Sequence, residues 1–372
     1  MTPFGREDSS VLGRWWWEVD RYALGGLLLL AAVSILLMNS ASPSVAERIG
    51  VDSLHFIRKH TLLIGPALAV MFLVSLLSPR HVRRLAALLL GLSLLLLLLT
   101  PFTGAEVKGA VRWISIAGVS VQPSEFAKPA FAVVAAALFA ASRLGERIPG
   151  YALAAGLYAV LAFLIIRQPD VSQAVILTLV WLSQFFLSGI PLVLVPLLAA
   201  LIVSGIIVSY LLFPHVQQRV DGFLNPGSVD SYQLDRAADA FANGGVWGVG
   251  LGNGAEKIHL PDSHTDFILA VAAEEFGLVF CLLLIGLYVF ILLRCAFRAA
   301  ASGDLFIMLA TTGLLTQFAA QALVNMASTL SLIPTTGMTL PFISYGGSSL
   351  LSLSLGMGML LALTRTGRRT AP

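Results

Sequence analysis

Long apolar runs separated by short polar segments dominate the chain between Tyr22 and Leu363. The runs are close to the length of about 20 residues that an α-helix needs to cross the hydrocarbon core of a bilayer. A transmembrane β-barrel would instead show segments of about ten residues with alternating hydrophobicity. The pattern therefore predicts an all-α polytopic membrane protein with about ten transmembrane helices. These are expected near residues 22–41, 60–77, 85–100, 124–141, 151–166, 172–188, 191–213, 268–293, 304–326 and 343–363.

One polar segment is far longer than the others and separates the seventh span from the eighth. It covers residues 214–265 and includes the glycine-rich stretch Gly244–Gly254. The rest of the chain predicts a single membrane domain, residues 22–364, between an N-terminal segment 1–21 and a tail 365–372. An even number of spans places both termini on one side of the membrane and the long loop on the other.

The distribution of Lys and Arg predicts the orientation of the chain. Thirteen of the 23 basic residues fall on the side of the termini, including those in the short loop Ser78–Arg84 and the pair Arg368–Arg369. Short loops rich in Lys and Arg are retained in the cytoplasm. We therefore expect cytoplasmic termini and an extracytoplasmic loop 214–265.

The composition agrees with a membrane protein and excludes other classes. The chain is 57% hydrophobic and 12% charged, whereas soluble domains carry about 25% charged residues. A net charge of +3 is too small to indicate nucleic acid. Cys281 and Cys295 lie on or beside one expected helix and would be about 21 Å apart, so they cannot form a disulfide with each other.

Charged residues flank the expected start of the fourth span. Glu125 and Lys128 follow Pro123 and Ser124, which mark a helix start, and their i,i+3 spacing puts both side chains on one face. Charges at membrane depth are paired or functional, so a structural ion pair and a direct role in substrate binding are both open. Arg112, upstream in the same loop, can bind a phosphate through two parallel hydrogen bonds or act as an ordinary interfacial arginine.

The hairpin between the fifth and sixth spans, Arg167–Asp170, carries both signs of charge. Such short turns are commonly stabilised by an ion pair within the turn, and we expect one between Arg167 and Asp170. A contribution of this turn to the rim of a cavity is the alternative.

Asp266 lies at the end of the long loop, directly before the eighth span. Ser263–Asp266 has the pattern of a capping box, in which Ser263 is the N-cap and Asp266 the third helical residue. The alternative is a catalytic carboxylate at the mouth of a partly dry cavity, acting as a general base. Glu274 and Glu275 follow in the span, and adjacent helical residues point about 100° apart, so at most one readily faces the same interior as Asp266.

Two glycine-rich segments predict irregular backbone near the membrane. Gly250, Gly252 and Ala255 match the spacing of a dinucleotide-binding loop, but no βαβ unit is predicted around them. We therefore expect tight turns and a close approach of backbone to backbone. Residues 331–349 contain prolines and glycines but no charge, which favours a loop that dips into the protein.

Four of these segments together resemble the SEDS family (shape, elongation, division and sporulation), in the same order and over nearly the whole chain. The segments Trp15–Arg21 and Thr335–Pro341 resemble division proteins of the FtsW type more than elongation proteins of the RodA type. The four segments are Val121–Pro129, Leu260–Ile268, Ala273–Gly277 and Pro341–Ser349.

The resemblance implies a peptidoglycan glycosyltransferase of the cytoplasmic (inner) membrane that polymerises lipid II at its outer face, during cell division for an FtsW-like member. Lipid II is a disaccharide-pentapeptide linked to undecaprenyl pyrophosphate. The implied partners are a class B penicillin-binding protein, which is a transpeptidase, and other division proteins. The essential aspartate of the family corresponds to Asp266, and the acid and lysine of its fourth span correspond to Glu125 and Lys128.

The implied reaction sets what the other residues must do. Asp266 would take the proton of the attacking sugar hydroxyl, and the departing pyrophosphate would need positive charge or a metal. The candidate cations are Arg112, Lys128, Arg219 and Lys257, and Glu275 and Ser344 complete the expected substrate-binding set. No cofactor follows from the residues, and a divalent cation, Mg²⁺ or Mn²⁺, is the alternative source of charge.

Two other functions fit intramembrane charges and broken helices. A flippase for lipid-linked precursors, or another membrane transporter, would use the same features to move a substrate. A scaffold would use the long loop to position a transpeptidase. Formation of glycan polymer by the isolated protein separates the enzyme from both.

Overall fold

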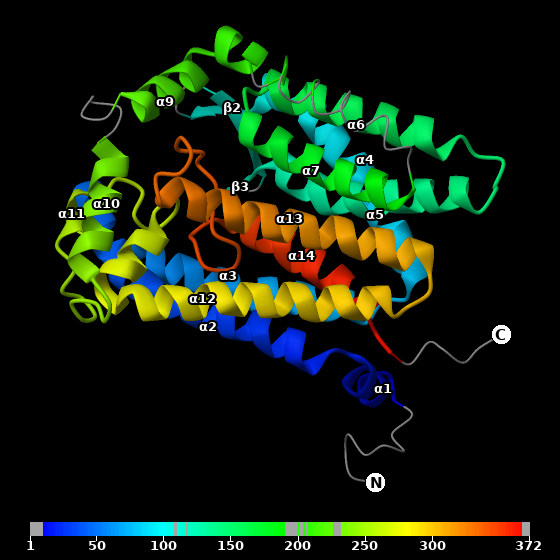
Figure 1. Ribbon diagram of the computed structural model, residues 1–372, viewed down its shortest axis with the longest axis horizontal. Helices are drawn as coiled ribbons and strands as arrows, with labels where there is room; N and C mark the ends of the chain where they lie inside the picture. The colour runs from blue at the N-terminus through cyan, green and yellow to red at the C-terminus, as the bar shows by residue number, and fades with distance from the viewer. Residues whose placement is uncertain are drawn as a thin grey trace.

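The computed structural model describes residues 10–107, 110–116, 118–189, 200, 204–205, 207–225 and 232–366. Most of these residues form helices that run side by side along the long axis of the molecule (Figure 1). Within the part of the chain that the structure describes, two apolar helices are short, α7 (Val171–Leu187) and α14 (Gly347–Leu363). Seven others among the described residues are long and apolar enough to cross a membrane: α2 (Arg21–Arg48), α3 (His55–Ser75), α4 (Pro79–Thr103), α5 (Pro123–Arg143), α6 (Gly150–Arg167), α12 (Ile268–Ala300) and α13 (Leu305–Thr329).

Nine of the expected spans correspond to these helices, with ends that differ by several residues. The seventh expected span, 191–213, falls mostly outside the described residues. The prediction of an all-α multi-pass membrane protein is confirmed by the helices that the structure describes.

A small antiparallel sheet between α4 and α5 departs from the purely helical prediction. Its strands β1 (Ala105–Val107), β2 (Ala110–Ile116) and β3 (Val119–Val121) follow one another in the order β1-β2-β3. Ile114 pairs with Val121, and Gly118 turns the chain between β2 and β3 with a φ of 80°. The sheet places Arg112 on its central strand.

The described chain begins and ends at one end of the bundle (Figure 1). The short helix α1 (Val11–Glu18) precedes α2, and the Thr366 amide donates to the Glu18 carbonyl at 3.1 Å. Asp20 is fully buried, caps the first turn of α2, and binds Arg294 and Arg298 at the end of α12. The first and last described residues therefore lie at the same end of the bundle, and the assignment of that end to the cytoplasm stays a prediction.

α14 forms the centre of the bundle, against α3, α5 and α13. Nearly all of its side chains are buried, including Ser348, Ser349, Ser352 and Ser354. A helix that is buried all round needs no polar face. By contrast, α4 exposes leucines such as Leu88, as expected for contact with lipid.

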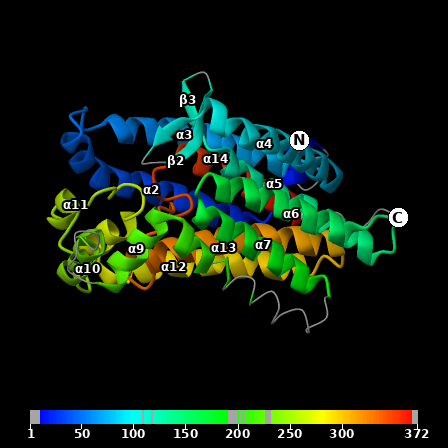
Figure 2. The same cartoon turned by 90° about the horizontal axis from the view of Figure 1, so that it is seen from above.

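The loop that was expected between the seventh and eighth spans is folded. It contains α9 (Pro214–Leu224), α10 (Tyr232–Gly244) and the single turn α11 (Glu256–His259). These helices cover the end of the bundle that lies opposite the chain termini (Figures 1 and 2).

The glycine-rich turn after α10 packs against a break in α12. Gly277 interrupts α12 with a φ of 78° and a ψ of −178°. The amides of Val249 and Gly250 donate to the carbonyls of Glu274 and Glu275, at 2.9 and 3.0 Å. A Cβ on Gly277 would lie 2.4 Å from the Gly248 amide nitrogen. The predicted close backbone approach is confirmed.

Candidate active site

Asp266 lies in the turn of residues 261–267, directly before α12, and is half-buried. The capping-box prediction is wrong because α12 starts at Ile268 and its N-cap is Phe267. The turn is instead closed by the Asp262 carbonyl, which accepts from the amides of Thr265 and Asp266, and Asp262 has a φ of 55°. The Ser263 hydroxyl donates to the Ala41 carbonyl of α2.

Asp266 and Arg219 meet at Gly337. A Cβ placed on Gly337 would lie 3.9 Å from Asp266 Oδ2, and 3.8 and 3.9 Å from the Nη2 and Nη1 atoms of Arg219. Arg219 comes from α9 and donates to the Thr335 carbonyl at 3.1 Å. Three separate segments therefore bring an acid, a guanidinium and a glycine to one place.

Arg219 keeps contact with solvent although protein surrounds it. Desolvation lowers the pKa of its guanidinium, the negative charge of Asp266 raises it, Arg112 lowers it, and Asp170 raises it. The causes of this shift show that two cations and two carboxylates interact here. An anionic substrate therefore has to compete with these carboxylates for the guanidinium groups.

Arg112 is held by the hairpin between α6 and α7. Its Nε donates to the Gln168 carbonyl at 2.9 Å, its Nη2 donates to the Pro169 carbonyl, and its Nη1 lies 3.9 Å from Asp170 Oδ1. The predicted Arg167–Asp170 pair is therefore wrong: Asp170 pairs with Arg112, and the Arg167 guanidinium lies 6.0 Å from the centre of the Phe163 ring.

Asp170 lies at the site through its pairing with Arg112, which agrees with the alternative that the sequence left open for this turn, a contribution to the rim of a cavity. It is buried, and Gln122 Nε2 donates to its Oδ2 at 2.9 Å. Burial raises the pKa of the Asp170 carboxyl, while the neighbouring Arg112 lowers it. An acid in a short turn between two apolar helices was the available signal, but its partners come from distant parts of the chain.

Glu125 and Lys128 form a buried ion pair in the first turns of α5. Their Nζ and Oε2 atoms are 3.0 Å apart, and the two side chains are 0% and 5% exposed for Lys128 and Glu125. Gln173 Nε2 donates to the other Glu125 oxygen at 2.6 Å. Of the two alternatives left open by the sequence, this geometry favours the ion pair. Both charges act on Asp170, so the pair also contributes to the electrostatics of the site.

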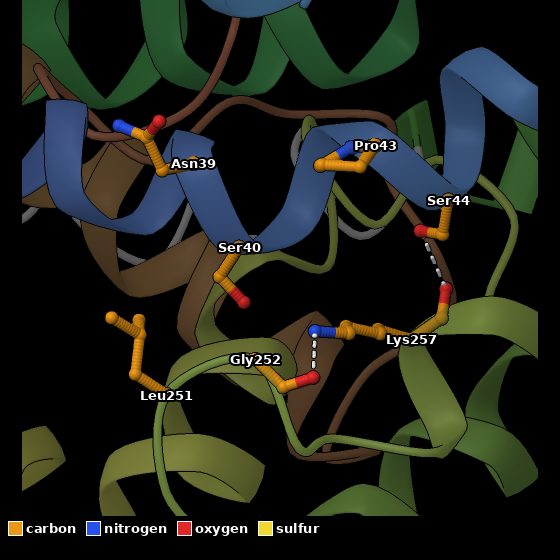
Figure 3. Close-up of a pocket in the computed structure, with 7 residues that line it drawn as sticks. All are labelled: Asn39, Ser40, Pro43, Ser44, Leu251, Gly252 and Lys257. Atoms are coloured by element: carbon orange, nitrogen blue, oxygen red, sulfur yellow. Dashed lines mark hydrogen bonds between the residues drawn. The ribbon is translucent and has the colours of Figure 1, made fainter. Parts of the chain in front are cut away.

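Lys257 and Glu275 pair with each other. Lys257 Nζ donates to Glu275 Oε1 at 2.6 Å and to the Gly252 carbonyl at 3.0 Å. Lys257 also lines a cavity of about 310 Å³ between α2 and the Gly252–Lys257 turn, with Ser40 and Ser44 on its other wall (Figure 3). Both residues are therefore held in an ion pair at the Gly252–Lys257 turn.

Glu274, the other acid of this segment, caps α11. Its Oε1 accepts from the amides of Ala255 and Glu256, both at 2.9 Å. Carboxylates are favoured at a helix N-terminus. The two adjacent acids of α12 therefore have different structural partners.

Ser344 belongs to the loop between α13 and α14, residues 330–346. Its hydroxyl donates to the Thr265 carbonyl at 2.5 Å and accepts from the Leu340 amide at 2.8 Å. The loop is non-helical and buries Met338, Phe342 and Ile343, which confirms the predicted inward dip. Ser344 therefore fixes this loop next to Asp266.

The acidic side chains of the site are potential metal ligands. Within the described ranges, no group of three or more His, Cys, Asp and Glu side chains could hold a metal ion. A cation at Asp266 would accordingly need oxygen ligands from a substrate as well.

Comparisons with known proteins agree over nearly the whole chain. A family model described as cell cycle protein, FTSW_RODA_SPOVE, matches residues 21–369. A probable peptidoglycan glycosyltransferase FtsW of Caulobacter vibrioides is 43% identical over 363 residues, which cover 97% of this chain and 93% of that protein.

Two solved structures have a similar fold. One chain, from a study of the structural coordination of polymerization and crosslinking by a peptidoglycan synthase complex, has a TM-score of 0.78 and 29% identity. The match covers 93% of this chain and 97% of that one. The rod shape determining protein RodA of Thermus thermophilus has a TM-score of 0.69 and 29% identity, over 94% of this chain and 97% of its own.

Proposed function

The chain belongs to the FtsW, RodA and SpoVE family of cell cycle proteins, and we propose that it polymerises lipid II into glycan strands during cell division. It is a peptidoglycan glycosyltransferase, as its relatives of the FtsW type are named. The observation that carries the mechanism is the meeting of Asp266 and Arg219 at Gly337. This site lies at the end of the bundle away from the termini, which we assign to the outer face of the cytoplasmic membrane.

Asp266 acts as the general base. It takes the proton of the sugar hydroxyl that attacks the anomeric carbon of the second lipid II molecule, and such assistance contributes about 10²–10⁴-fold to the rate. A single carboxylate is sufficient because the leaving pyrophosphate needs no dedicated acid, unlike the sugar leaving group of a glycoside hydrolase.

Arg219 is the best placed of the four candidate cations to bind the leaving pyrophosphate. Lys128 is buried against Glu125, and Lys257 is paired with Glu275. Arg112 is bound by the carbonyls of Gln168 and Pro169. Arg219 lies beside Asp266 and in contact with solvent, and a guanidinium matches the geometry of phosphate oxygens.

A divalent cation, Mg²⁺ or Mn²⁺, would add positive charge at the same place. Asp266 is the protein ligand that the geometry offers, and the pyrophosphate oxygens would supply the others. The polyprenyl chain of the substrate stays in the bilayer while its headgroup enters at the membrane face.

The working assembly includes a crosslinking partner. One structural relative was solved in work on a peptidoglycan synthase complex that coordinates polymerization and crosslinking. We assign the partner of this chain to the class B penicillin-binding proteins, with other division proteins around it, and we place both termini in the cytoplasm.

Polymerisation of lipid II by the purified protein in detergent tests this function. We expect glycan strands from protein mixed with lipid II, with or without the transpeptidase partner present. A flippase or a scaffold would form no polymer under these conditions, so a consistent lack of polymer from folded protein in both mixtures would reject the proposal.

A further inference from the structure

One buried amide joins the segment that carries Asp266 to the loop that carries Gly337. Asn325 lies on α13 and is 1% exposed. Its Nδ2 donates to the Asp266 carbonyl at 2.9 Å and to the Met338 carbonyl at 2.6 Å. Both N–H groups of a single side chain are therefore used, one on each segment.

Thr329 makes a second, weaker contact of the same kind one turn later on α13. Its hydroxyl lies 3.3 Å from the Asp266 carbonyl and 2.8 Å from the Asn325 carbonyl. The Asp266 carbonyl oxygen thus receives two contacts from one helix. Because α13 is long and largely buried, it offers a more rigid support than the loops that it contacts.

Met338 directly follows the glycine at which Asp266 and Arg219 meet. Any change in the Asn325 bonds therefore alters the distance between the carboxylate and the opposite wall of the site. On the basis of the proposed function, we infer that Asn325 is a positioning residue. Its hydrogen bond to the Asp266 backbone carbonyl, rather than any bond to the Asp266 carboxylate, holds Asp266 at the correct distance from Gly337 and Arg219.

The expected effect is large because catalysis depends steeply on geometry. A misplacement of 1 Å can cost about 10²-fold in rate. Loss of positioning lowers kcat and leaves KM close to its original value, since the groups that bind the substrate are retained. A merely structural loss would reduce the folded fraction without changing the kcat of the molecules that remain folded.

The chain offers a matched control toward the other end of α13. Gln184 lies on α7 and is fully buried. Its Nε2 donates to the Ala132 carbonyl at 2.6 Å and to the Leu309 carbonyl of α13 at 3.1 Å. Leu309 precedes Asn325 by about 24 Å along the helix. Replacing Gln184 therefore removes a similar pair of buried hydrogen bonds without touching the segments that carry Asp266 and Gly337.

The experiment compares Asn325→Leu, Thr329→Val, Gln184→Leu and Asp266→Asn by lipid II polymerisation, with kcat normalised to folded protein. We expect a loss of about 10- to 100-fold in kcat for Asn325→Leu at unchanged KM, and a smaller loss for Thr329→Val. Gln184→Leu should lower the melting temperature and keep kcat. If Asn325→Leu does not fold, Thr329→Val tests the same carbonyl without a change of shape.

Each outcome has a defined meaning. Full kcat in folded Asn325→Leu, or in Thr329→Val where Asn325→Leu does not fold, would overturn the positioning role while leaving the proposed function intact. An equal loss of kcat in Gln184→Leu would overturn it as well. An active Asp266→Asn variant would reject the general base itself, and the positioning role with it.

Discussion

The backbone of Gly337 faces the carboxylate of Asp266 so closely that a methyl group on the glycine would contact Oδ2 at 3.9 Å. The glycine has a φ of 70°, in the left-handed region. A residue with a side chain pays about 1–2 kcal/mol for this conformation. Backbone conformation and the space beside the acid therefore both favour glycine here.

Gly337→Ala should lower the polymerisation rate. The added methyl would occupy the space between Asp266 and Arg219, and the backbone strain would move the loop. We expect a loss of about tenfold or more, since small displacements at reacting groups are costly. Steady-state polymerisation by folded protein measures it, and wild-type kinetics in this variant would show that the gap is not used by substrate.

Gly277→Ala should destabilise the protein. The left-handed backbone costs about 1–2 kcal/mol, and the new Cβ would collide with the Gly248 amide nitrogen at 2.4 Å. Gly286→Ala in the same helix is the control, because its Cβ would meet no atom of the described residues within 4 Å. The melting temperature in detergent should fall for Gly277→Ala only. Equal melting temperatures for the two variants would contradict the described helix break.

Lys128→Met should unfold the protein more readily than wild type, because it leaves the Glu125 carboxylate buried without its cation. Removing one partner of a buried ion pair costs about 3–5 kcal/mol. The double variant Glu125→Gln, Lys128→Met should recover most of this loss in thermal unfolding. A double variant as unstable as Lys128→Met would argue against a structural pair.

Asp170→Asn should change how stability depends on pH. Burial raises the pKa of the Asp170 carboxyl despite the nearby Arg112. As pH rises, the unfolded chain therefore releases the proton of the Asp170 carboxyl at about pH 4, whereas the folded protein releases it only at a higher pH. Stability falls as pH rises from that point through the folded pKa, because the unfolded state binds fewer protons in this window.

The Asp170→Asn variant has no titratable carboxyl at this position, so it does not show this loss of stability with rising pH. The melting temperature of Asp170→Asn minus that of wild type should accordingly increase as pH rises through the window. Thermal unfolding in a series of buffers measures this difference. A constant or decreasing difference would show that the carboxyl is not held in an environment that favours its neutral form.

Hydropathy alone predicted the bundle, because helices that face lipid must be apolar and long. Hydropathy did not predict β1–β3, because these strands are much shorter than the stretch of about 20 residues over which a membrane span is recognised. The Ser348–Ser354 region was predicted only as part of a span, since burial of serines in the centre of the bundle depends on neighbours from other helices.

The ion pairs of the structure differ in how far apart their residues lie in the sequence. Glu125 and Lys128 are i,i+3 on one helix, so their proximity followed from helix geometry. Arg112 with Asp170, and Lys257 with Glu275, are joined only by the tertiary fold. From the sequence alone, these four residues could not be distinguished from unpaired cations and acids that bind substrate.

Asp266 shows both the strength and the limit of local patterns. Its motif placed it at the loop end beside α12, as found. The capping-box prediction is wrong because the turn closes on the Asp262 carbonyl. In addition, the Asp266 carbonyl is bound by α13, which is distant in the sequence. A sequence pattern cannot show such tertiary bonds.

In the proposed mechanism, the Asp266 carboxylate drives glycan extension. Polymerisation of lipid II by Asp266→Asn protein measures it most directly, with Asp239→Asn as the control. Asp239 is a half-exposed acid on α10 that pairs with Arg236. We predict that Asp266→Asn folds, and that its rate falls by about 10²-fold or more, while Asp239→Asn retains activity. Glycan strands formed by folded Asp266→Asn protein at the wild-type rate would contradict the account.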